Sequence, residues 1–285
     1  METKINKNVV VYFSPSGNTA KVADIIVDAL KQTGEKTIVL NLIEKDEPDY
    51  KKWASDTLNP GDCLWVGSPV YAHHALPQVM DFISGLPVIE NCYVVPFVTY
   101  GAVTSGMALF EMGRMLTEKG FKVPGAAKVP TLHSMMWMFQ NPLGEGRPNK
   151  EDESVIRDLV KAVYKKLSRH DTAKYLTSDQ LNYQLESSRK KFNPAGIATT
   201  KKIFPPMKFN ADLCTECNIC EQECPTRNIA LEPSFRFKDN CIFCFNCVRN
   251  CETKAITNDI FNVIEGKLKM LAEEYSEPSV SRIFF

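Results

Sequence analysis

The sequence predicts an α/β fold, in which a doubly wound sheet of five parallel strands is followed by a small α+β domain. Two observations indicate it. Residues 1–167 alternate short apolar runs with amphipathic helical patterns, as in a parallel sheet covered by helices on both faces. Two cysteine runs with one internal spacing then fall within residues 206–257, a stretch too short to build a large core of its own.

The strands and helices of the first part follow from their apolar patterns. Residues 9–13 are continuously apolar, as in a strand buried on both faces. The helix after them has Gly34 as its expected C-terminal cap, and Pro77 marks the first turn of a later helix. A further helix closes at Gly120, and the last one carries the apolar face Ile156 to Leu167. The predicted strands are residues 9–13, 37–40, 64–66, 93–98 and 122–129.

The composition changes after residue 167. Residues 168–205 are polar and basic, with few bulky aliphatic side chains, and we expect them to form a linker. Residues 206–257 form the cysteine-rich domain, which contains an internal repeat. Residues 258–285 are predicted as a C-terminal helix and tail, whose apolar face should pack on the core rather than on a membrane.

The cysteine spacing is typical of iron–sulfur ligation. Each run places three cysteines at intervals of three residues and a fourth four residues later, which is too far along to close the same cluster easily. The pattern therefore predicts two [4Fe–4S] clusters with crossed ligation. Cluster 1 would be held by Cys214, Cys217, Cys220 and Cys251, and cluster 2 by Cys241, Cys244, Cys247 and Cys224.

Other uses of the eight cysteines fit less well. Structural zinc takes two cysteine pairs rather than three evenly spaced cysteines plus a fourth. A disulfide framework is typical of short secreted chains. The second run lacks the proline that follows Cys224 in the first, but proline is not a ligand. Cys63 and Cys92 lie outside both runs, at the starts of apolar stretches, and are expected to be buried.

A polar loop follows the first predicted strand at the point where a doubly wound sheet binds anions. It reads Ser14-Pro15-Ser16-Gly17-Asn18-Thr19 and leads into a helix, whose first N–H groups have no intrahelical partner. The loop has no Lys or Arg and is not G-x-G-x-x-G, so it is neither a Walker loop nor a dinucleotide fingerprint. A hydroxyl-rich neutral loop suits a phosphate monoester. The simpler alternative is a Ser/Thr cap on a polar turn.

This loop resembles the phosphate loop of flavodoxins, [Ser/Thr]-x-[Ser/Thr]-Gly-Asn-Thr. The resemblance implies the strand order 2-1-3-4-5 and a bound FMN, with Ser14, Ser16, Gly17, Asn18 and Thr19 at its phosphate. It also implies that the flavin ring lies between the loops after the third and fourth strands. The ring-binding candidates in those loops are Ser68, Pro69, Tyr71, Thr99, Tyr100 and Gly101, although the tyrosines could equally serve ordinary loop packing.

The cysteine-rich domain resembles the bacterial two-cluster ferredoxins over about fifty residues, with a spacing specific to them. A flavodoxin-like domain followed by a ferredoxin-like domain resembles the flavodoxin–ferredoxin fusion proteins of anaerobic microorganisms. The resemblance implies FMN and two [4Fe–4S] clusters as cofactors. The cluster domain should then pack against the flavin loops at residues 68–74 and 99–106.

Three further features bear on chemistry at the flavin. His73 and His74 follow Tyr71 and are weak candidates for supplying a proton to reduced flavin, because histidine titrates near neutrality. The alternative is a solvated loop. The segment His133 to Phe139 is unusually apolar for a loop, and it should cover the flavin, a partner surface or a satellite core.

Composition limits the partners. The chain has 285 residues, and its 34 Lys and Arg balance its 34 Asp and Glu, so bound clusters and a flavin phosphate would make the protein acidic. We therefore expect no nucleic acid partner. No apolar stretch approaches the ~20 residues of a membrane span. The polar start predicts no signal peptide, and the clustered thiols predict a reducing cytoplasm.

These observations predict an electron-transfer iron–sulfur flavoprotein that passes single electrons between the two clusters and FMN. It would be either a carrier or an oxidoreductase that reduces a small acceptor at the flavin. Its partners would be redox proteins or a small-molecule electron acceptor, with no membrane and with the oligomeric state left open. The alternative is a regulatory protein that senses redox state or oxygen without turnover.

Overall fold

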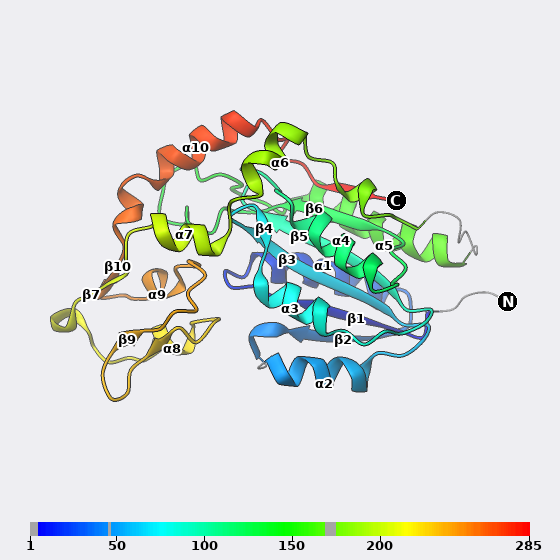
Figure 1. The fold of residues 1–285 in the computed structure, drawn as a ribbon, viewed down its shortest axis with the longest axis horizontal. Helices are drawn as coiled ribbons and strands as arrows, with labels where there is room; N and C mark the ends of the chain where they lie inside the picture. The colour runs from blue at the N-terminus through cyan, green and yellow to red at the C-terminus, as the bar shows by residue number, and fades with distance from the viewer. Residues whose placement is uncertain (1–4, 45–46, 169–174) are drawn as a thin grey trace.

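The structure is a computed structural model that describes residues 5–44, 47–168 and 175–285. The polar start at residues 1–4 and part of the predicted linker, residues 169–174, lie outside the described residues. A large α/β unit contains the sheet, and a smaller unit with short strands and helices lies beside one end of it (Figure 1).

Five parallel strands form the middle of the sheet, in the order β2-β1-β3-β5-β6. This confirms the order 2-1-3-4-5 that the resemblance implied. The strands are β1 (Lys7–Tyr12), β2 (Lys36–Asn41), β3 (Cys63–Tyr71), β5 (Tyr93–Tyr100) and β6 (Ala126–Pro130). The last strand begins later than predicted. Only an isolated bridge joins Lys122 to Tyr93, because Pro124 has no N–H to donate to a ladder.

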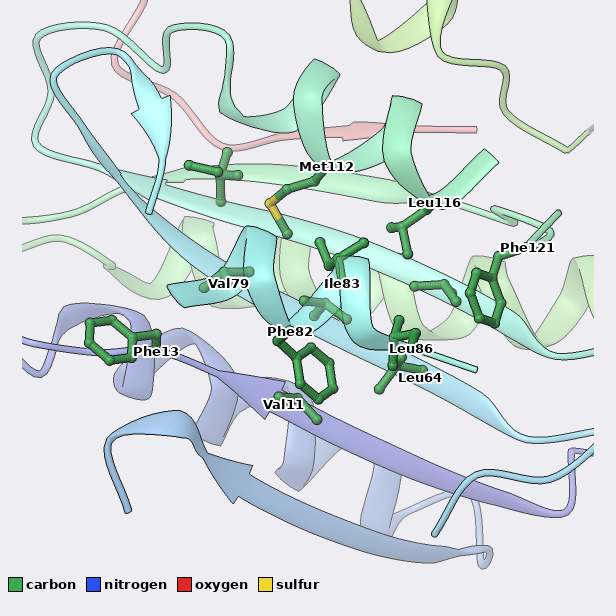
Figure 2. Close-up of a cluster of buried hydrophobic side chains, with 14 of the residues drawn as sticks. Val11, Phe13, Leu64, Val79, Phe82, Ile83, Leu86, Met112, Leu116 and Phe121 are labelled. Carbon is green, nitrogen blue, oxygen red and sulfur yellow. The ribbon is translucent and has the colours of Figure 1, made fainter. Parts of the chain in front are cut away.

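Helices cover both faces of the sheet and bury its apolar side chains. On one face, α1 (Asn18–Lys31) and α5 (Lys150–Ser168) share a core with Val10, Trp65 and Val95. On the other lie α2 (Glu47–Thr57), α3 (Pro77–Gly85) and α4 (Ala108–Glu118). Figure 2 shows Phe82 and Ile83 of α3 beside Val11 and Leu64 of the strands. Each such side chain contributes about 1.5–3 kcal/mol on burial. The sequence did not predict α2, whose apolar pattern is short.

The remaining elements connect the two units. After α5 come two short helices, α6 (Glu186–Phe192) and α7 (Ile197–Ile203), and Phe192 is fully buried. The small unit comprises β7 (Lys208–Phe209), α8 (Ile219–Gln222), β8 (Ile229–Ala230), β9 (Arg236–Phe237), α9 (Asn246–Arg249) and β10 (Ile256–Thr257). Helix α10 (Ile264–Tyr275) then packs Ile264 and Leu268 into a third core with Val103, Met136 and Phe245.

Two antiparallel strands enlarge the predicted five-stranded sheet. Strand β4 (His74–Ala75) folds back on the end of β3, and β11 (Arg282–Phe284) pairs with the β6 edge. The residues predicted as a C-terminal tail therefore return to the large unit (Figure 1). Neither strand has a sequence signal of its own, because each is only two or three residues long.

A buried ion pair attaches the C-terminal segment to the sheet. Lys128 of β6 donates to the Glu277 carboxylate, and both side chains are less than a tenth exposed. Glu277 also accepts from Thr104 at 2.7 Å, from the Ser105 backbone at 2.9 Å and from Gln184 at 2.9 Å. Burial alone would raise the pKa of Glu277, but the charge of Lys128 and these hydrogen bonds outweigh it and lower that pKa.

We expect Glu277→Ala to lower the free energy of unfolding by about 3–5 kcal/mol, since it leaves Lys128 buried without its partner. Urea unfolding measures this. The control, Asp158→Ala, breaks the exposed pair with Lys161 and should change stability by less than about 1 kcal/mol. Because the pKa of Glu277 is lowered on folding, its contribution should be complete at neutral pH and disappear as pH falls through that lowered value. Equal effects of the two substitutions would contradict this assignment.

Candidate cofactor sites

The loop after β1 has the backbone shape of an anion site. Gly17 has φ +81°, which turns the chain into α1. The Ser14 hydroxyl accepts from the Ala20 N–H at 2.9 Å and closes the first turn of the helix. The Asn18 side chain donates to the Leu132 carbonyl at 2.7 Å. Ser14 and Asn18 thus fix the loop, and the other N–H groups of the first turn have no intrahelical partner.

A cavity of about 340 Å³ opens at the carboxyl ends of β3 and β5. Both predicted ring loops and the phosphate loop line it, as expected for a ligand at the switch point of this strand order. The wall opposite comes from α7, α10 and the second cysteine run. Among the predicted site residues, the lining contains Ser16, Asn18, Pro69, Tyr71, His73, Thr99, Tyr100 and Gly101.

Three predicted site residues have structural partners elsewhere. Thr19 shares a buried hydrogen bond of 2.8 Å with Thr99 and joins the phosphate loop to β5. Ser68 accepts from the Leu76 N–H at 3.0 Å and so fixes the β3–β4 connection. His74 has both ring nitrogens engaged, one by Glu111 at 2.6 Å and one by the Phe192 carbonyl at 3.0 Å. None of the three lines the cavity, and neither do Ser14 or Gly17.

The β3–β4 hairpin places Tyr71 and His73 at the cavity. Ala72 and His73 form its two-residue turn with φ +46° and +74°, a conformation in which glycine or asparagine is usual. Non-glycine residues held there are strained, and such strain concentrates at functional sites. The His73 ring stacks on Phe192 at 4.5 Å. Burial, together with His74, lowers the pKa of His73 to about 4, so its ring is neutral at pH 7.

Tyr71 and Tyr100 differ in what their hydroxyls contact. The Tyr100 hydroxyl donates to the Pro278 carbonyl at 3.1 Å, so the C-terminal segment holds it. The Tyr71 hydroxyl is buried without a hydrogen bond, although Ser16 and Ser134 lie close enough to influence its pKa. Burial raises that pKa above its ordinary value. An unpaired hydroxyl at the cavity wall fits a polar ligand that is held there.

His133 is a cavity residue that the sequence placed only within an apolar covering segment. Its ring occupies the space left by Gly101, where a Cβ would lie 2.4 Å from the ring. Nδ1 accepts from the Met135 N–H at 3.2 Å, and burial lowers the pKa of His133 to about 4. The neutral ring therefore carries its proton on Nε2, which makes it a donor at the cavity. Only the fold brings Gly101 and His133 together.

The two cysteine runs repeat in backbone conformation as well as in sequence, at an interval of 27 residues. In each run the residues immediately before and after the second cysteine are left-handed, and so is the residue three positions after the fourth cysteine. The matching pairs are Glu216 and Phe243, Asn218 and Phe245, and Arg227 and Lys254, with φ between +49° and +61°. Strand β7 pairs with β10, and β8 with β9, so each of these two-stranded sheets combines one strand from each half.

Four cysteines from both runs surround one small cavity. Cys224 of the first run lines it together with Cys241, Cys244 and Cys247 of the second. Burial, followed by the neighbouring cysteines, raises the pKa of Cys244 to about 12 and that of Cys247 still higher. Thiols with so high a pKa stay protonated at neutral pH unless a cationic metal centre replaces the proton. This fits ligation of iron. This is the grouping predicted for cluster 2.

The first run forms a separate group. Cys214, Cys217 and Cys220 interact electrostatically, and Cys217 is exposed. Burial would raise the pKa of Cys251, but N–H groups of Ile256, Ala255 and Lys254 and the Thr253 hydroxyl lower it. Hydrogen bonds of this kind stabilise a thiolate ligand. Over residues 5–44, 47–168 and 175–285, no group of three or more His, Cys, Asp or Glu has the geometry of a single-ion site.

Comparison with known proteins identifies the second unit. Residues 206–252 match the family model of the 4Fe-4S dicluster domain. The chain joins a flavodoxin-like domain to a 4Fe-4S dicluster domain. The first domain has the flavodoxin strand order and a cavity at its switch point. No curated protein matches the chain in the corresponding comparison.

Several solved structures are similar to part of this flavodoxin–dicluster chain. Rubredoxin:oxygen oxidoreductase of the anaerobe Desulfovibrio gigas is 20% identical over 58% of this chain and 37% of its own, with a TM-score of 0.46. A flavodoxin from the domain Archaea is 18% identical over 56% and 98%, with a TM-score of 0.40. The apo form of the NADH:FMN oxidoreductase EmoB is 20% identical over 60% and 95%, with a TM-score of 0.45. The chain thus spans little more than a third of the first of these proteins.

The dicluster domain packs directly on the flavodoxin-like loops, as expected from the sequence. Asn246 donates to the Pro15 carbonyl in the phosphate loop. Ile242 and Phe243 line the large cavity, and Cys244 is close enough to Tyr71 for their charges to interact. The second cysteine run therefore lies against the candidate flavin site.

Among the described residues, every helix is too short or too polar to span a lipid bilayer.

We expect Cys244→Ala to remove about four irons per chain, because it deletes one ligand from the four-cysteine group. Iron and sulfide analysis of anaerobically purified protein measures this loss. Cys92→Ala is the control: Cys92 is also buried but lies outside both runs, and the iron content of this variant should stay at the wild-type value. Equal iron in both variants would exclude Cys244 as a ligand.

Proposed function

We propose that the flavodoxin–dicluster chain is an electron-transfer iron–sulfur flavoprotein. It passes single electrons between two [4Fe–4S] clusters and an FMN, and it exchanges them with a redox partner. The observation that carries this proposal is the shared wall: Ile242 and Phe243 of the second cysteine run line the same cavity as the phosphate and ring loops. Bound FMN would supply two-electron chemistry, whereas each cluster holds one electron.

The protein itself would hold these groups in place through side chains already described. The loop at Gly17 and the first turn of α1 would hold the phosphate, since unpaired N–H groups and the helix dipole favour an anion. Tyr71 and the neutral ring of His133 would present donors to the flavin. The cysteines around the small cavity would hold cluster 2 nearest the flavin. Cys214, Cys217, Cys220 and Cys251 would hold cluster 1 at the exposed end of the domain.

The shape of the large cavity supports reduction of a small acceptor. The lining continues beyond the flavin loops to α7 and α10, with apolar contributions from Ile197, Phe204 and Leu271. Most of a pocket for an organic ligand is apolar, with a few placed polar groups. His133 and His73 are such groups, and burial keeps both neutral at pH 7. A proton that either histidine donated at this cavity would therefore come from a neutral N–H.

The first test is chemical analysis and rapid kinetics on the anaerobically purified full chain. We expect about eight irons and one FMN per chain, the content that two clusters and one flavin site require. In stopped-flow mixing with a one-electron donor, the flavin should be reduced by way of the clusters. Cys244→Ala should therefore slow flavin reduction at least tenfold, while Cys92→Ala should not change it. Zinc without flavin, or equally fast flavin reduction in Cys244→Ala, would exclude the proposed function.

The two cysteine runs differ in charge in a way that indicates where electrons enter. Between its first and fourth cysteines the first run carries Glu216, Glu221 and Glu223, all exposed, and no Lys or Arg lies between residues 211 and 226. The second run contains no acidic residue and is packed against the flavodoxin-like domain. The exposed run therefore suits a donor with a positively charged surface.

Removing three of these charges should change reduction rates according to the charge of the donor. We expect Glu216→Gln, Glu221→Gln and Glu223→Gln together to slow reduction by the cationic methyl viologen radical several-fold at low ionic strength. The same variant should be reduced faster by anionic dithionite, and both effects should fade above about 0.1 M salt. The control neutralises Asp24, Asp28 and Glu153, which are exposed on α1 and α5. The same response in both variants would place electron entry elsewhere.

A further inference from the structure

One arginine lies between the candidate flavin site and the cysteine group nearest to it. Arg249, at the end of α9, donates to the Ser134 carbonyl at 2.8 Å, and its guanidinium lies 4.7 Å from the centre of the Trp137 ring. Ser134 itself lines the large cavity. The titratable groups that lie close enough to Arg249 to influence its pKa are Tyr71, at the cavity, and Cys244, in the four-cysteine group.

This guanidinium has no anionic partner. In the part of the chain that the structure describes, no carboxylate pairs with Arg249, and its Nε is buried without a hydrogen bond. Burial lowers the pKa of Arg249, although an arginine stays charged at neutral pH. A charge that is partly buried and lacks an anionic partner is unfavourable. Arg147, in contrast, pairs with Asp152.

The iron–sulfur cluster would be the missing anion. A [4Fe–4S] cluster held by four thiolates carries about −2 overall, and each reduction adds one negative charge. A fixed cation beside it favours the reduced form, and the effect is largest where water is excluded. We propose that the positive charge of Arg249 raises the reduction potential of cluster 2 above that of cluster 1. This inference rests on the proposed function.

The internal repeat supplies the comparison. The residue 27 positions before Arg249 is Gln222, in the same place relative to the first cysteine run. Gln222 is neutral and exposed, so no cation stands at the matching position of the first run. Transfer from cluster 1 to cluster 2 would oxidise cluster 1 and reduce cluster 2 by one electron, with no proton, and would move that electron toward the positive charge of Arg249. The asymmetry would therefore favour transfer toward the flavin.

The test is a redox titration of the holoprotein followed by electron paramagnetic resonance. Arg249→Gln introduces the residue that stands at the matching position of the other half. We expect it to lower the equilibrium constant for reduction of cluster 2 at least tenfold, which lowers the reduction potential by about 59 mV for a one-electron couple. The reduction potential of cluster 1 should change much less. Arg249→Lys keeps the charge and should retain most of the potential. The reciprocal variant, Gln222→Arg, should make cluster 1 easier to reduce.

Two controls separate the outcomes. Cys217→Ser alters an exposed ligand of cluster 1 and so identifies which resonance signal belongs to it. Iron and flavin contents equal to those of the wild type show that each arginine variant is fully loaded. A loaded Arg249→Gln protein in which neither potential moves, or both move equally, overturns this inference and leaves the proposed function standing. A wild-type protein without clusters overturns both.

Discussion

The structure depends on the packing of the second cysteine run against the loops at the ends of the parallel strands. Asn246 bonds to the phosphate loop, Ile242 and Phe243 complete the cavity wall, and Cys244 lies near Tyr71. A cluster held there and a flavin held in the cavity would share a wall, with no moving linker needed to bring them together. The left-handed backbone at Phe243 and Phe245 gives this run its shape.

The two halves of the dicluster domain have the same backbone plan but different surroundings. The first half is exposed and acidic, and the second is apolar and covered. The cysteine spacing is common to both. The intervening residues differ with what each half contacts, which is solvent in one case and the flavodoxin-like loops in the other. In the proposed function, one half would serve as an entry point for electrons and the other as an internal relay.

The sequence predicted the features that depend on local spacing or on long apolar patterns. Cysteine intervals, the Ser14–Thr19 loop and the positions of the central strands are of this kind, whereas the order of those strands followed from the resemblance to flavodoxins. Strands β4 and β11 were missed because each is short and pairs with residues that only the fold brings near. His133 and Arg249 were not recognised as site residues for a similar reason. Their importance comes from Gly101, which lies distant in sequence from His133, and from Tyr71, which lies distant from Arg249.

The return of the last residues to the sheet changes how the two domains are related. Strand β11 pairs with β6 of the first domain, although the whole dicluster domain lies between them in sequence. Topologically, the dicluster domain is therefore an insertion into the flavodoxin-like fold, anchored at both of its ends, rather than an appendage on one linker. During synthesis this edge strand emerges after the dicluster domain. The sheet is thus completed only after both cysteine runs have left the ribosome.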